Sequence, residues 1–200
     1  MIQKILVSFY VLMLATSLHA QQNGYQIALQ SFQQDYLQSH EVVKNEDRKF
    51  VQFFPIDEYF RITAAFTKLN DSTGFKMKTS GTKDQTYFRY GKLLFNIHDT
   101  TIELTLYQSQ QLMGDSTYQN YLFLPFTDVT SGEESYGGGR YIDIDMARIR
   151  NNKVVVDFNK AYNPYCAYST GYNCPIPPRE NDMPVAIRAG EMDFLKQPAQ

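Results

Sequence analysis

The chain has 200 residues, of which 43% are hydrophobic, and a formal net charge of −2. A slightly acidic chain does not provide the basic face that binds nucleic acid, so we expect no nucleic-acid partner. It contains no Trp but 15 Tyr and 14 Phe. This composition predicts a core closed by Phe and a surface or cleft that is rich in phenol groups.

The first 20 residues are typical of a secretory signal peptide. Lys4 provides a positive charge, residues 5–14 are apolar, and small residues lead up to Ala20. The apolar run is too short to span a bilayer permanently, so we expect cleavage and no stable membrane insertion afterwards. Residues 21–200 are then predicted to be exported, to the periplasm or the extracellular medium, and to form a single β-rich domain.

The N-terminal part of the exported chain has helical periodicity. Apolar residues recur at three- and four-residue spacing from Tyr25 to Val43. This spacing predicts one amphipathic helix, and the charged residues 44–49 that follow are typical of a solvated loop.

From about residue 53 onward the apolar period is two, which is the period of half-buried strands. Short segments rich in turn-forming residues separate the apolar runs, and no helical pattern lies between them. We therefore expect a mainly β fold, in which an antiparallel meander curls into a barrel or sandwich. Gly91 indicates a bend or bulge in the longest strand. The expected strands include residues 60–66, 75–78, 87–97, 102–106, 121–126 and 185–188.

Residues 141–145 and 154–159 are predicted to form a β-hairpin around Asn151 and Asn152, because Asn tolerates the positive φ of tight turns. The register that gathers the apolar residues on one face leaves four polar residues on the other. Their oxygens suit a hard cation such as calcium, but the spacing lacks the loop of a dedicated calcium site, and a solvated face is the simpler interpretation. We therefore expect no cofactor, with calcium as the one alternative. The four residues are Asp143, Asp145, Asp157 and Asn159.

Three consecutive glycines, residues 137–139, precede Arg140. Backbone amides of a glycine-rich loop can bind phosphate. This loop leads into a strand, however, whereas the known phosphate loops lead into a helix. The glycines more simply allow a sharp turn or a close approach to another backbone, and Arg140 is then available for a carboxylate of the protein or of a ligand.

Cys166 and Cys174 are the only cysteines. In an exported chain two lone cysteines most simply form a disulfide, and a loop this short contributes about 2–3 kcal/mol. We expect the result to be a disulfide-bearing C-terminal lobe. After a proline-rich run, Glu180 is predicted to pair with Arg140 or Arg188 and so to hold this lobe to the sheet.

Four motifs in the C-terminal half are distinctive. They are D-x-T-S-G-E-E-S-Y-G-G-G-R-Y, D-F-N-K-A-Y-N-P-Y-C-A-Y, C-P-I-P-P-x-E-N and V-A-I-R-A-G-E. Together they resemble the signature of the bacterial domain-of-unknown-function family number 1684, with a looser similarity over residues 60–107. The resemblance implies that the glycine loop, the cysteine lobe and the proline-rich run form one family-wide device. It implies no activity and no catalytic residues.

Two functions compete on this sequence. The first is a non-catalytic module that binds a small molecule, a glycan or a protein through a lobe rich in Tyr, Arg and Asn. The second is an enzyme with hydrolase-like acid–base chemistry, in which Glu133, Glu134 or Asp143 acts with Arg140, although no recognised catalytic motif supports it. We favour the first. The candidate ligand-binding residues are Tyr136, Arg140, Asn163, Tyr168, Glu180, Asn181 and Arg188.

Overall fold

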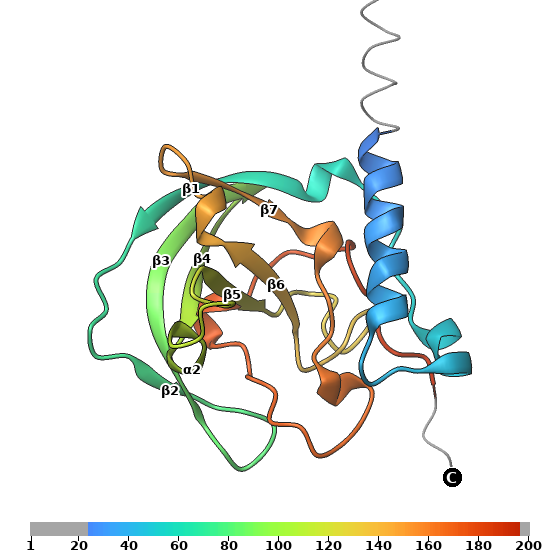
Figure 1. Cartoon of the computed structure of the whole chain (residues 1–200). Coiled ribbons are helices and arrows are strands. Elements are labelled where there is room, and N and C mark those ends of the chain that lie inside the picture. Colours follow the sequence, from blue (N-terminus) through green and yellow to red (C-terminus); the bar gives the residue numbers. More distant parts are fainter. Residues whose placement is uncertain (1–23, 197–200) are drawn as a thin grey trace, which may run out of the picture. The chain divides into compact units, whose positions relative to one another are not determined.

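The structure is a computed structural model that describes residues 24–196 (Figure 1). The predicted signal peptide, residues 1–20, lies outside the described residues. The chain divides into two compact units, residues 1–40 and residues 41–200, which are described separately.

In the first unit, residues 24–39 form an α-helix, which confirms the predicted N-terminal helix. The helix ends earlier than predicted, at a serine whose side chain turns back onto the last turn. Ser39 Oγ donates a hydrogen bond to the carbonyl oxygen of Asp35, four residues earlier, at 2.7 Å, and a serine that bonds back in this way is common near a helix end. Among residues 24–196, no helix combines the length and the apolar character needed to cross a membrane.

The second unit is built on one seven-stranded antiparallel sheet that curls into a half-barrel (Figure 1). The strand order is β6-β5-β4-β3-β1-β7, and β2 pairs with β3 outside this path. This sheet confirms the predicted antiparallel, mainly β fold. The strands are β1 Arg61–Lys68, β2 Phe75–Met77, β3 Gln85–Ile97, β4 Thr100–Ser109, β5 Tyr121–Phe126, β6 Arg140–Asp145 and β7 Lys153–Asp157; helix α2 is Gln110–Met113.

Strand β3 contains the predicted bulge. Its register with β4 shifts between Arg89 and Gly91. A Cβ atom at Gly91 would lie 2.3 Å from the ring of Phe66 on the neighbouring strand, so only glycine fits where the two strands approach.

The two faces of the sheet carry different cores. Leu122 on β5 and Ile142 on β6 belong to the main core, where each buried aliphatic side chain contributes about 1.5–3 kcal/mol. Phe123 and Tyr141 alternate with them and therefore lie on the opposite face. There they form a second cluster that is mostly aromatic, made of Met77, Tyr87, Tyr107, Phe123 and Tyr141. Three of the 15 tyrosines thus belong to this second cluster, and Tyr121 and Tyr162 pack against it.

The predicted hairpin between residues 141–145 and 154–159 is wrong. Strand β6 pairs with β5 and strand β7 pairs with β1, at opposite ends of the strand order. The tight turn itself is present, because Asn151 and Asn152 have φ values of 51° and 56°. A 3-10 helix, Met146–Arg148, follows the first arm and separates it from the turn. The alternation correctly predicts which residues of the two strands face the main core. It does not determine which strand pairs with which.

The predicted strand over residues 185–188 is also wrong, since this described segment has no strand. Its backbone instead makes one bond to another backbone, from the amide of Val129 to the carbonyl of Val185 at 3.2 Å, and further bonds to buried side chains. The amide of Ile187 donates to Asp128 Oδ1 at 3.1 Å, and the carbonyl of Ile187 accepts from Arg140 Nη2 at 2.8 Å. Side-chain partners thus replace the ladder that a strand would have provided.

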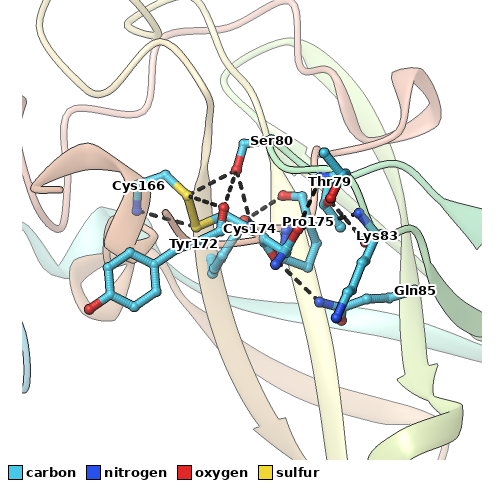
Figure 2. Close-up of a disulfide and its surroundings, with 11 residues drawn as sticks. Thr79, Ser80, Lys83, Gln85, Cys166, Tyr172, Cys174 and Pro175 are labelled. Carbon is cyan, nitrogen blue, oxygen red and sulfur yellow. Dashed lines mark hydrogen bonds between the residues drawn. A yellow bond between two sulfur atoms is a disulfide. The ribbon is translucent and has the colours of Figure 1, made fainter. Parts of the chain in front are cut away.

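The cysteine lobe, which we define as residues 163–178, contains the predicted disulfide between Cys166 and Cys174. Figure 2 shows Ser80, from the loop between β2 and β3, at the centre of its contacts. Ser80 Oγ accepts from the amide of Cys174 at 3.1 Å and lies 2.9 Å from Cys166 Sγ. The side chain of Gln85 also donates to the carbonyl of Asn173, at 3.1 Å. These bonds fix the disulfide loop against the sheet.

Candidate functional site

Arg140 is the centre of a buried polar network. Its Nη2 donates to Asp128 Oδ2 at 2.8 Å, and its Nη1 donates to the carbonyl oxygen of Ala189 at 2.6 Å. Neither side chain of the Asp128–Arg140 pair is exposed. Desolvation lowers the pKa of Arg140, and the charge of Asp128 opposes this change. These bonds tie the start of β6 to the C-terminal segment, so Arg140 is directed at the protein itself.

Asn163 and Tyr168 join the same network at Glu191. The amide of Asn163 donates to Glu191 Oε2 at 2.9 Å, and the hydroxyl of Tyr168 donates to Glu191 Oε1. Arg140 Nη1 reaches the backbone carbonyl of Glu191 at 3.1 Å. The structure thus brings three of the predicted ligand-binding residues together, but around a carboxylate that is completely buried.

Glu180 does not pair with Arg140 or Arg188, so that prediction is wrong. Its Oε1 accepts from Arg89 Nε at 3.0 Å and from the hydroxyl of Tyr107 at 2.6 Å. Arg188 pairs instead with Glu134, at 2.7 Å. The partner of Glu180 depends on which strands lie beside it in the fold. The spacing of charges along the chain does not show this. Glu180 thereby joins the end of the proline-rich run to β3 and β4.

The side chain of Asn181 fills an interruption in the sheet. Pro125 on β5 has no N–H group to donate, and β4 and β5 are in register only at Tyr107 and Phe123. Asn181 Nδ2 donates to the carbonyl oxygens of Pro125 at 2.7 Å and of Thr105 at 2.9 Å. Its Oδ1 accepts from the amide of Thr105 at 2.7 Å. The buried amide of Asn181 therefore substitutes for hydrogen bonds of the ladder.

The glycine loop makes a close approach to the proline-rich run. Gly139 has a φ of 86°, and a Cβ atom there would lie 2.6 Å from the carbonyl oxygen of Phe126 and 2.7 Å from Pro177 Cγ. This supports the steric interpretation of the glycines over a phosphate site. Tyr136 packs over Gly138 in the same loop. Burial raises the pKa of the Tyr136 hydroxyl, and the negative charge of Asp193 adds a smaller increase.

The four residues predicted to share one polar face do not share it. Asp145 accepts from the amide of Ala147 at 2.7 Å and caps a 3-10 helix. Asp157 ends β7 and caps the 3-10 helix Phe158–Lys160, because its Oδ1 accepts from the amide of Asn159 at 3.2 Å. The expected face depended on the hairpin that does not form. Within residues 24–196, no three His, Cys, Asp or Glu side chains are grouped so that they could hold a metal ion.

Asp143 is the member of this set with the most distinctive surroundings. The hydroxyls of Tyr121 and Tyr162 both donate to its Oδ1, at 2.9 and 2.7 Å. Tyr121 begins β5 and Asp143 lies on β6, while Tyr162 is held beside β6 by two backbone hydrogen bonds with Tyr141, of 2.9 and 3.0 Å. We call the side chains of Tyr121, Asp143 and Tyr162 the Asp143 cluster.

The register of β5 and β6 creates the cluster. Asp143 lies opposite Phe123, and Tyr121 lies opposite Asp145, so Tyr121 and Asp143 are diagonal neighbours on one face. Sequence reasoning selected Asp143 but missed Tyr121 and Tyr162. The signal in the sequence is the period-two position of Tyr121 and Asp143, which places both on the face opposite the main core, beside the second cluster. Only the strand order brings them together.

The electrostatics of the cluster are unusual for an exposed group. Asp143 is exposed to solvent. The surrounding protein nevertheless removes enough water to raise the pKa of its carboxyl, and the hydrogen bonds from Tyr162 and Tyr121 oppose that rise. Burial and the neighbouring carboxylate also raise the pKa values of Tyr121 and Tyr162. A perturbed carboxylate that solvent can reach is characteristic of functional sites.

Aromatic packing holds the phenols in place. Tyr141 contacts Phe123 with ring centroids 4.7 Å apart, and its ring meets that of Tyr162 edge to face at 5.8 Å. Tyr118, which is 47% exposed, meets the ring of Tyr121 edge to face at 6.4 Å. The cluster therefore has a rigid aromatic support on the protein side and an accessible ring beside it.

The fold and site define the class as an antiparallel half-barrel that carries an exposed carboxylate between two phenols. Residues 47–192 match the family "Protein of unknown function (DUF1684)", and the chain belongs to this family, as its motifs predict. The solution NMR structure of an uncharacterized protein of Haloarcula marismortui is similar, with a TM-score of 0.66 and 26% identity over 88% of this chain and 98% of that chain. No curated protein matches.

Proposed function

We propose that this protein is a non-catalytic binding module that takes a small polar ligand at the Asp143 cluster. One observation carries the proposal: two phenol hydroxyls orient a carboxylate that remains exposed to solvent. Aromatic rings give contact area at low entropic cost, and a few polar atoms then fix the orientation of a ligand. Strands β5 and β6 hold two of the three side chains, which suits a site formed before the ligand binds.

The proposal moves the binding site away from the cysteine lobe. Arg140, Asn163 and Asn181 are buried among protein partners. Recognition through tyrosine is retained, because Tyr162 immediately precedes the lobe. Calcium is not included, since Asp143 supplies one carboxylate where that ion needs six to eight oxygens.

The acid–base enzyme is not carried forward. It requires Arg140 as an electrophile beside Asp143 or a glutamate. The guanidinium of Arg140 is fully buried and bonded to Asp128 and to backbone carbonyls, so a substrate could reach it only if this network opened.

We also propose that the module acts outside the cytoplasm after removal of residues 1–20. The sequence of these residues supports export, and the disulfide supports an oxidising compartment. Cell fractionation followed by N-terminal sequencing tests this proposal. A protein that remains in the cytoplasm with Met1 attached would contradict it.

Ligand binding is tested with protein that carries ¹³C-labelled tyrosine. Amines, polyols and sugars are added in turn, and the ring signals of Tyr121 and Tyr162 are followed by NMR. We expect at least one class to shift these signals in the wild type and in Asp145→Asn, but to bind Asp143→Asn at least tenfold more weakly. Asp145 is the matched control because it is an exposed aspartate on the same strand. Equal binding by both variants, or no shift with any compound, would refute the proposed site.

A further inference from the structure

The hydrogen-bonding capacity of the Asp143 cluster indicates the chemical class of its ligand. This inference rests on the proposed function. Each phenol has one O–H donor, and both donors are already directed at Oδ1 of Asp143. Within the described residues, Oδ2 of Asp143 accepts no hydrogen bond. The cluster therefore offers acceptors to a ligand and no free donor, so the ligand must donate.

The charge of the cluster is also unbalanced. The buried carboxylate of Asp128 faces the guanidinium of Arg140 at 2.8 Å, and the exposed carboxylate of Glu134 faces that of Arg188 at 2.7 Å. None of the ion pairs among residues 24–196 includes Asp143. Its bonding partners are neutral phenols. An ionised Asp143 therefore has local hydrogen bonds but no positive partner.

A cationic ligand would supply what the cluster lacks. Desolvation disfavours the charged form of Asp143, as the raised pKa of its carboxyl shows. An opposite charge within about 4–6 Å favours the charged form. A sugar hydroxyl would provide the hydrogen bond without the charge. Between the two kinds of donor, the electrostatics favour the cation.

The surrounding side chains favour an organic cation over a metal ion. A single carboxylate is too few ligands for calcium, and no metal-holding group of acidic, His or Cys side chains occurs in the described part of the chain. Aromatic surface is instead provided by Tyr121, whose hydroxyl bonds to the carboxylate, and by Tyr118, whose ring meets that of Tyr121 at 6.4 Å. Aromatic rings attract organic ammonium and guanidinium groups and pack against their apolar stems.

We infer that the ligand is a small organic cation whose N–H groups donate to Oδ2 of Asp143, while its apolar stem lies against Tyr118 and Tyr121. Ammonium and guanidinium ions share this chemistry. The ligand must therefore carry both a positive charge and N–H donors.

The test measures the affinity of the purified protein for four probes by calorimetry and tyrosine NMR at low salt. The probes are n-butylammonium, n-butylguanidinium, n-butanol as the neutral isostere and glucose. We expect at least one of the two cations to bind at least tenfold more tightly than n-butanol and glucose. Its affinity should fall at least tenfold in Asp143→Asn and change less than about threefold in Asp145→Asn.

The outcomes separate this inference from the proposed function. If glucose or n-butanol binds at the cluster as tightly as the cations do, the ligand class is wrong and the binding site stands. If both asparagine variants lose cation affinity equally, the attraction is long-range and the inference fails. If no probe shifts the signals of Tyr121 or Tyr162 while the broader panel does, only the inference fails. Circular dichroism spectra of both variants show whether they remain folded.

Discussion

Asp128 and Arg140 form an ion pair in which neither side chain is exposed, with Oδ2 of Asp128 lying 2.8 Å from Nη2 of Arg140. The other oxygen of Asp128 accepts from the amides of Thr130 at 2.8 Å and Ile187 at 3.1 Å. One carboxylate thus bonds to its own loop, to the start of β6 and to the C-terminal segment. The pair therefore holds together segments that are distant in the sequence.

Asp128→Ala is expected to lower the free energy of unfolding by about 3–5 kcal/mol, because it leaves the charge of Arg140 buried without a partner. Urea denaturation measures the loss. The matched control is Glu134→Ala, which breaks the exposed pair with Arg188. Its effect should be much smaller, since solvent screens that pair. Equal losses in the two variants would show that the buried pair is not the centre of the network.

Asn181→Leu is expected to cost about 2–5 kcal/mol, because it leaves buried backbone groups of Thr105 and Pro125 without their partner. Leucine has a similar size, so the loss reports mainly on hydrogen bonding. Hydrogen exchange should also show faster exchange of the Thr105 amide. Asp182→Ala, which removes an exposed bond to Thr127, is the control and should leave that exchange unchanged.

Gly139→Ala should destabilise the fold by about 2–4 kcal/mol, because it combines a positive φ with a close contact to Phe126 and Pro177. Gly114→Ala is the control, since a Cβ atom there meets nothing within 4 Å and its φ is −81°. Thermal unfolding of the two variants makes the comparison. A harmless Gly139→Ala would mean that the loop and the proline-rich run can move apart.

The strands were predictable from the sequence because burial on one face imposes a period of two. Leu122 and Ile142 illustrate this, since both were expected in strands and both lie in the main core. The role of Arg140 was predictable only in part: a carboxylate of the protein was one of its two expected partners, and Asp128 is that carboxylate. The partners of Arg140 also include the backbone of residues 187–191, a segment without regular structure whose path no local pattern specifies.

The Asp143 cluster was predictable only in part. Alternation places Asp143 on the face of its strand opposite the main core, and this face also carries the buried Tyr141. The expected hairpin then gave it Asp157 as a neighbour, whereas the true neighbour is β5, which brings Tyr121. Periodicity determines the face on which a side chain lies, whereas strand order determines which residues are its neighbours on that face. Strand order depends on long-range packing, and here a 3-10 helix at residues 146–148 separates β6 from the turn at Asn151 and Asn152.

Asp143→Asn is expected to stabilise the fold at neutral pH. Desolvation raises the pKa of Asp143 in the folded chain, so keeping this carboxyl ionised opposes folding. Asparagine retains a side-chain oxygen that can accept from Tyr121 and Tyr162, but it carries no charge. Urea midpoints measured from about pH 3 to pH 8 test the prediction, with Asp145→Asn as the control.

The direction of the pH dependence follows from the raised pKa. In the wild type, the favourable contribution of Asp143 is complete below the pKa of an unfolded aspartate, near pH 4, and is lost as the pH rises through the higher folded value. The advantage of Asp143→Asn should therefore be small at pH 3 and reach its full size above the folded pKa. A variant that is less stable than the wild type at pH 7 would show that the ionised carboxylate stabilises the two phenols. A variant that gains stability while losing cation binding would show that the charge of Asp143 serves the ligand at the expense of the fold.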